Sequence, residues 1–123
     1  MYRLCISLLA GMAGLVSVTH AVAGQMCRPS LAFKEVRFSE MLAPTRERKW
    51  TAVVSVDASR CATHSTGAFE IIFARVKENA PDIEFSEKFM WSPPSVTIAV
   101  DFWADEAAER YWITNVSTCP CAR

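Results

Sequence analysis

The residues best suited to chemistry in this chain are its cysteines, four of which follow an apolar N-terminal segment. They are Cys27, Cys61, Cys119 and Cys121. An even number of cysteines in an exported chain is typical of disulfide pairing. Cys119 and Cys121 are separated only by Pro120, so a disulfide between them would close a strained ring. We therefore expect Cys27 to pair with one of these two residues and Cys61 with the other, in either combination.

A metal site is the alternative use of the same sulfur atoms. Its ligands would be Cys61, His64, Cys119 and Cys121, with Cys27 either unused or in place of the histidine. Thiolates together with an imidazole suit Zn²⁺ or Cu(I). However, the spacings C-x2-H and C-x-C lack the repeated C-x2-C pattern of zinc ribbons, and an oxidising compartment favours disulfides over free thiols. A redox-active C-x-C pair is a third interpretation. The preferred interpretation is the two structural disulfides, which involve no cofactor.

Catalytic groups are few once the N-terminal segment is set aside. His64 is then the only histidine, and it lies near Ser59 and Ser65 without the third group and oxyanion hole that a catalytic triad needs. Gly24 and Gly67 are the only glycines left, so neither a P-loop nor a dinucleotide-binding loop can form. A cluster of acidic residues around one turn is interpreted as solvated: Asp101, Asp105, Glu106 and Glu109. We therefore expect a protein that is not an enzyme, with redox or hydrolytic activity as the least favoured alternative.

Aromatic residues near the C-terminus form a candidate binding surface. Trp103 has the parity opposite to the apolar face of 96–102 and lies close to Asp101. Tyr111 and Trp112 are neighbours on one expected strand, so one of them should face inward and the other outward. If Trp103 and the outward residue lay on adjacent strands, they would form an aromatic patch beside Asp101, of the kind that often binds a partner. Cross-strand packing that stabilises the sheet is the alternative role.

Residues 1–23 have the pattern of a secretory signal peptide. Arg3 precedes an apolar run over 4–18, and Ala21-Val22-Ala23 provides the small residues of a cleavage site. This run is shorter than the roughly 20 residues that cross a bilayer as a helix, so cleavage is favoured over a retained anchor. The expected product is a single domain, 24–123, that is secreted or periplasmic and has no transmembrane segment.

Most of the remaining chain alternates between apolar and polar residues with a period of two, which is typical of β-strands. The clearest segments are 50–58, 83–91 and 96–102. The segment 68–77 is apolar on both parities, as in a strand that is buried on both faces or central in its sheet. In 31–41 the apolar parity changes between Phe33 and Val36, which predicts a β-bulge near Lys34-Glu35 in an edge strand.

The order of these segments also predicts where the cysteines meet. If six strands alternate in direction, the start of the first, the end of the second and the end of the last lie at the same end of the domain. All four cysteines would then converge there. The segment 105–112 is rich in helix formers, which predicts a short helical turn at 105–109 and a last strand over about 110–117.

These patterns predict an all-β domain, an antiparallel β-sandwich of six to seven strands with an immunoglobulin- or fibronectin III-like topology. A small closed β-barrel is the alternative. The thirteen basic and thirteen acidic residues balance, which gives no electrostatic reason to expect nucleic-acid binding. The expected role is non-catalytic: binding, adapting or structurally supporting a protein or another component of the cell envelope or the extracellular space.

Overall fold

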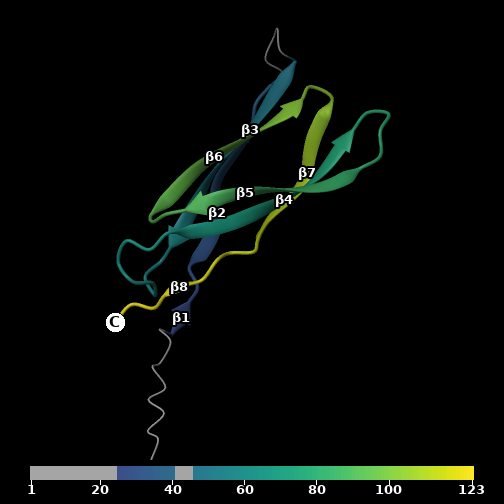
Figure 1. Ribbon diagram of the computed structural model, residues 1–123. Coiled ribbons are helices and arrows are strands. Elements are labelled where there is room, and N and C mark those ends of the chain that lie inside the picture. Colours follow the sequence, from purple (N-terminus) through teal and green to yellow (C-terminus); the bar gives the residue numbers. More distant parts are fainter. Residues whose placement is uncertain (1–24, 41–45) are drawn as a thin grey trace, which may run out of the picture.

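The computed structural model describes residues 25–40 and 46–123, which form strands connected by short turns and loops (Figure 1). The six long strands are β2 (Ser30–Phe38), β3 (Glu47–Asp57), β4 (Gly67–Lys77), β5 (Ile83–Trp91), β6 (Ser95–Trp103) and β7 (Glu106–Thr114). Two short strands, β1 (Met26–Cys27) and β8 (Cys119–Pro120), pair with each other at one end of the domain. The expected signal peptide lies outside the described residues.

The long strands form two antiparallel three-stranded sheets, in the orders β2-β3-β6 and β5-β4-β7. The two sheets pack face to face, as the two layers in Figure 1 show. The chain builds the β2-β3 hairpin, crosses to the other sheet for β4-β5, and then returns for β6 and crosses again for β7. This arrangement confirms the predicted antiparallel β-sandwich and is consistent with an immunoglobulin-like fold.

The predicted helical turn at 105–109 is wrong. Ala104 and Asp105 form a tight turn, and β7 begins at once with Glu106, which lies opposite Lys77 of β4. Helix propensity is a weak preference that tertiary pairing overrides. Here β7 gains a backbone ladder with β4 along its whole length, and a helical turn would forfeit part of that ladder.

The core consists of the inward-facing residues of both sheets. The largest fully buried side chains are Trp50, Trp91, Phe69, Phe73, Ile71, Val54 and Cys119. Trp50 is at the centre, with its ring centroid 4.7 Å from that of Phe73 and 5.2 Å from that of Tyr111. Edge-to-face aromatic contacts of this kind add stabilisation beyond the area they bury. The parity predicted for β3 is therefore confirmed, because Trp50, Ala52, Val54 and Val56 are all buried.

The strand edges show two irregularities. The register of β2 against β3 shifts between Phe33 and Glu35, which confirms the predicted bulge in an edge strand. The register of β7 against β4 also shifts, leaving Glu109 without a partner residue on β4. Both bulges occur on strands that border only one neighbour.

Candidate functional site

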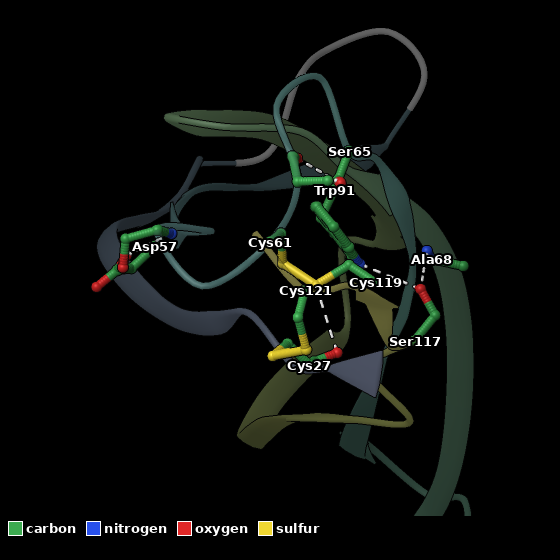
Figure 2. The surroundings of a disulfide bond; sticks show 11 residues. Cys27, Asp57, Cys61, Ser65, Ala68, Trp91, Ser117, Cys119 and Cys121 are labelled. Atoms are coloured by element: carbon green, nitrogen blue, oxygen red, sulfur yellow. Dashed lines mark hydrogen bonds between the residues drawn. A yellow bond between two sulfur atoms is a disulfide. The ribbon is translucent and has the colours of Figure 1, made fainter. Parts of the chain in front are cut away.

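The four cysteines meet at one end of the sandwich, as predicted from the strand order. They form two disulfides, Cys27–Cys121 and Cys61–Cys119, with Cα–Cα distances of 4.9 Å and 5.6 Å (Figure 2). Each member of the Cys-Pro-Cys pair thus bonds to a different distant cysteine, as expected. The choice between the two combinations, which the sequence left open, is made by the three-dimensional arrangement.

The C-terminal Cys-Pro-Cys segment is the middle strand of a small three-stranded arrangement. On one side, β8 pairs antiparallel with β1. On the other side, the Ala62 N–H donates to the Pro120 carbonyl at 2.7 Å, and the Ala122 N–H donates to the Arg60 carbonyl at 2.8 Å. The N-terminal strand, the loop after β3 and the C-terminus are therefore joined by backbone hydrogen bonds as well as by sulfur.

The disulfides are crossed relative to this backbone register. Cys27 lies opposite Cys119, and Cys61 lies opposite Cys121. Yet Cys27 bonds to Cys121 and Cys61 bonds to Cys119, so each bond joins a residue to the diagonal neighbour of its partner. The two bonds therefore resist shear of the C-terminal strand against both of its neighbours.

The two disulfides differ in their exposure to solvent. Cys61 is 5% exposed and Cys119 is 1% exposed, whereas Cys27 and Cys121 are half-buried. Each of the four sulfur atoms belongs to one of these two disulfides, whereas the metal alternative requires free thiolates. The fourth residue of that alternative, His64, is exposed in the loop after β3, with a positive φ of 64°.

A polar contact fastens the segment before β8 to the adjacent sheet. The Ser117 hydroxyl accepts hydrogen bonds from the Ala68 N–H at 2.8 Å and from the Trp91 Nε1–H at 3.2 Å (Figure 2). The close approach depends on Gly67, because a Cβ there would lie 2.1 Å from the Ser117 Oγ and 2.6 Å from the Trp91 ring. This contact was not predicted, because no local pattern relates these three positions.

An open pocket of about 400 Å³ lies beside the loop after β3, and Asp57, His64 and Ser65 are among its lining residues. The Asp57 carboxylate accepts the Ser59 N–H at 3.0 Å. Hydrogen bonds from Ser59 hold the pKa of Asp57 below its usual value of 3.8. The hydroxyl has the larger effect and the N–H the smaller. The Ser65 hydroxyl donates to the Ala62 carbonyl at 2.5 Å. Among the described residues, no hydrogen bond joins His64 to this carboxylate or hydroxyl, so the three groups are not connected as a catalytic triad is.

The structure separates the residues of the predicted aromatic surface. Tyr111 faces inward, with its ring centroid 5.1 Å from that of Phe33. Trp112 therefore faces outward from the β5-β4-β7 sheet, where the Arg110 guanidinium lies 5.8 Å from its ring centroid. Trp103 ends β6 and is 55% exposed on the outer face of the other sheet. Because the two tryptophans point away from opposite sheets, they do not form one patch.

Each tryptophan nevertheless belongs to a distinct surface. Asp101 shares the outer face of β6 with Trp103 and lies 3.9 Å from the Lys49 ammonium. On the opposite sheet, Trp112 lies beside half-buried Ile72 of β4, its register partner. By strand register, charged residues occupy neighbouring positions on this face: Glu70 of β4, Glu84 and Lys88 of β5, and Arg110 of β7. The outer face of the β5-β4-β7 sheet thus has a small apolar centre and a charged border.

The opposite end of the sandwich holds a buried carboxylate that sequence reasoning missed. Glu106, which was assigned to a solvated acidic turn, is only 6% exposed. Its carboxylate lies 3.0 Å from the Arg75 guanidinium and accepts the Trp103 N–H at 2.7 Å. Arg48 donates to the Glu106 carbonyl at 3.3 Å and lies 3.8 Å from the centroid of the Phe38 ring. The contact of Glu106 with Arg75 depends on the pairing of β7 with β4, so no local motif could have revealed this ion pair.

Comparisons with known proteins find no match: no family model, curated protein or solved structure matches this chain. Within residues 25–40 and 46–123, no helix has the length and apolar character needed to cross a membrane.

Proposed function

We propose that this chain is an exported, disulfide-stabilised β-sandwich with a non-catalytic binding or structural role in the cell envelope or outside the cell. The observation that carries the proposal is the pairing of all four cysteines of the described residues in two disulfides. Such pairing persists in oxidising compartments, and residues 1–23 have the composition of a segment that directs a chain there.

The polar groups near the loop after β3 support a structural assignment for that loop. The Asp57 carboxylate accepts a hydrogen bond from Ser59 and the Ser65 hydroxyl donates to Ala62, and both bonds shape the loop. The outer face of the β5-β4-β7 sheet, centred on Trp112 and Ile72, is the surface we assign to a partner. A tryptophan with an apolar neighbour and a charged border has the composition of a binding hot spot.

The first test is the intact mass of the protein purified from its native compartment, with and without thiol alkylation, together with metal analysis. We expect a chain that starts near Gly24, has the mass of two disulfides and gains nothing on alkylation. Alkylatable thiols with stoichiometric zinc or copper would contradict the proposal and favour the site at Cys61, His64, Cys119 and Cys121.

The binding surface is tested by comparing Trp112→Ala with Thr114→Ala, which removes a side chain from the same face of the same strand. We expect Trp112→Ala to lower retention of the protein on isolated envelope or matrix material about tenfold, while Thr114→Ala changes it little. Equal retention of both variants, with unchanged melting temperatures, would remove this face from the proposal.

A further inference from the structure

The four edge strands of the two sheets differ in how they are protected against pairing with another chain. Natural proteins protect edges with charged side chains, bulges and prolines. Strand β2 has a bulge, and three charged residues lie at or close to it: Lys34, Glu35 and Arg37. Strand β7 has a bulge at Glu109 and a charged neighbour in Arg110. Both strands therefore carry the usual protection.

Strand β5 is protected by charge and by its flanks. Its nine residues include Glu84, Glu87 and Lys88, and it is flanked by Pro81 and Pro93. Strand β6 also follows a proline, Pro94, but the backbone of Pro94 points to β3, and within its own nine residues β6 differs from the other three strands. Its register with β3 is continuous from end to end, and its sequence, SVTIAVDFW, is rich in β-branched and aromatic residues and contains a single charge, Asp101.

The direction of the free backbone groups of β6 follows from two hydrogen bonds that continue its ladder with β3. The Val56 N–H donates to the Pro94 carbonyl at 2.8 Å, and the Ala104 N–H donates to the Arg46 carbonyl at 2.8 Å. Backbone groups alternate in direction along a strand, so the N–H and C=O groups of the even-numbered residues of β6 point to β3. The N–H and C=O groups of the odd-numbered residues from Ser95 to Trp103 therefore point to the free edge.

One contact agrees with this assignment and marks where the free edge ends. The Trp103 N–H, which belongs to an odd-numbered residue, donates to the Glu106 carboxylate at 2.7 Å rather than to β3. The backbone groups of Thr97, Ala99 and Asp101 have no such cap among the described residues. The outward side chains beside them are small or polar and exposed, so a second strand can approach.

We propose that two copies of this chain associate through their β6 strands, which pair antiparallel across a two-fold axis at Ala99 and join two sheets into one of six strands. In this register Ala99 faces the partner's Ala99, and Thr97 faces the partner's Asp101. All of these residues have backbone groups that point to the free edge, so both copies donate and accept hydrogen bonds. Thr97 and the partner's Asp101 also place a hydroxyl beside a carboxylate.

The inward side chains match in the same register. Ile98 lies next to the partner's Val100, and Val96 lies next to the partner's Phe102. Val96 and Val100 are only half-buried in the single chain, so this contact extends the core of each sandwich. A register centred on Asp101 would instead oppose two carboxylates. The self-complementarity of β6 about Ala99 is therefore the reason to assign a second copy of the chain as the occupant.

This inference is independent of the proposed binding role, because β6 and Trp112 lie on different sheets. Sedimentation velocity over a range of concentrations tests it on the disulfide-bonded protein. We expect a reversible monomer–dimer equilibrium, and we expect Ala99→Lys to raise the dissociation constant at least tenfold because it opposes two ammonium groups at the axis. The matched control is Ala32→Lys, at an alanine that is also exposed on the outer face of β2, which should leave the equilibrium unchanged.

A cysteine at the axis tests the register itself. Directly opposed residues of a hydrogen-bonded antiparallel pair have Cα atoms about 5.5 Å apart, which a disulfide can span. Ala99→Cys should therefore give a covalent dimer on mild oxidation, and Ala32→Cys, which adds the same extra thiol, should not. A protein that stays monomeric at every concentration, or a dimer that survives Ala99→Lys, would overturn the proposal.

Discussion

The two ends of the sandwich are fastened by different kinds of interaction. At the disulfide end, formed by 25–30, 58–66 and 115–123, two disulfides tie together three segments that are distant in sequence. At the turn end, formed by 46–49, 75–78 and 103–106, the buried Glu106 carboxylate joins Arg75 to the end of β6. The chain therefore uses covalent bonds where β1 and β8 meet, and electrostatic contacts where β6 turns into β7.

This difference has a physical reason. Chain termini fray unless they are tied down, and β1 and β8 contribute only two residues each to the backbone ladder. A disulfide lowers the entropy of the unfolded chain, and its effect grows with the length of the loop that it closes. The loops here span 94 and 58 residues, and the longer one encloses nearly all of the described residues.

The largest expected effect is the loss of a disulfide. Each bond contributes about 4 kcal/mol in the chain-entropy description, and loop length separates the two by only about 0.4 kcal/mol. Burial decides their order, because replacing Cys61 and Cys119 with alanine also leaves a cavity in the core. We expect the Cys61→Ala/Cys119→Ala protein to lose more free energy of unfolding in urea than the Cys27→Ala/Cys121→Ala protein.

Reduction with a mild thiol gives an independent view of the same difference. The half-buried Cys27–Cys121 bond should be reduced and alkylated first, since an attacking thiolate can reach it. Peptide mapping of the alkylated sites identifies the order. Simultaneous reduction of both bonds would show that the disulfide end opens as one unit.

At the turn end, the largest expected effect comes from Glu106→Gln. The substitution keeps the shape and an acceptor for the Trp103 N–H but leaves the Arg75 guanidinium without its anion. Breaking a fully buried ion pair costs about 3–5 kcal/mol, and the Arg75 side chain remains 18% exposed, so we expect a loss of about 2 kcal/mol. Chemical denaturation measures the loss.

Glu109→Gln is the matched control for this prediction. It removes the same charge from an exposed position on the same strand and should change stability by less than about 0.5 kcal/mol. If the two variants lose equal stability, the ion pair does not fasten the turn end.

The contrast between the two ends also explains what the sequence predicted. Period-two alternation is a local signal, so strands β2 to β6, the buried face of Trp50 and the bulge near Lys34 were predicted correctly, whereas the last long strand, expected at about 110–117, is β7 at Glu106–Thr114. The convergence of the cysteines followed from counting passes of the chain. The burial of Glu106 and the hydrogen bond from Trp91 to Ser117 depend on which strands pair. The acidic composition of the segment around Glu106 cannot distinguish a solvated turn from a buried hydrogen-bond acceptor. The helical turn at 105–109 failed for the same reason, since pairing with β4 decided the conformation.

A smaller effect is expected for Ser117→Ala, which tests how much noncovalent contact contributes at the disulfide end. The variant leaves the Ala68 N–H and the Trp91 Nε1–H without their shared acceptor. Unsatisfied buried donors cost about 1–3 kcal/mol, and the partial exposure of this site places the expected loss near the lower limit. The matched control, Thr118→Ala, removes an exposed neighbouring hydroxyl and should be nearly neutral. If Ser117→Ala is also neutral, the Ser117 contact adds nothing to the disulfides and backbone hydrogen bonds that already fasten this end.

The smallest expected effect is electrostatic and lies beside the disulfides. Hydrogen bonds from Ser59 hold the pKa of Asp57 below its usual value of 3.8 in the folded protein. The ionised carboxylate therefore contributes stability above about pH 4. As the pH falls, the unfolded chain binds the proton first, and the contribution is lost by the time the pH has passed the lowered pKa of the folded protein. Asp57→Asn should flatten this part of the stability–pH curve and leave the rest of its shape in place, as measured by urea unfolding at a series of acidic pH values.

Asp82→Asn, at an exposed position before β5, controls for the loss of one negative charge. A curve for Asp57→Asn that superimposes on that of the control would mean that the Ser59 contacts have no energetic consequence, and that the disulfide end, unlike the turn end, depends on no charged group.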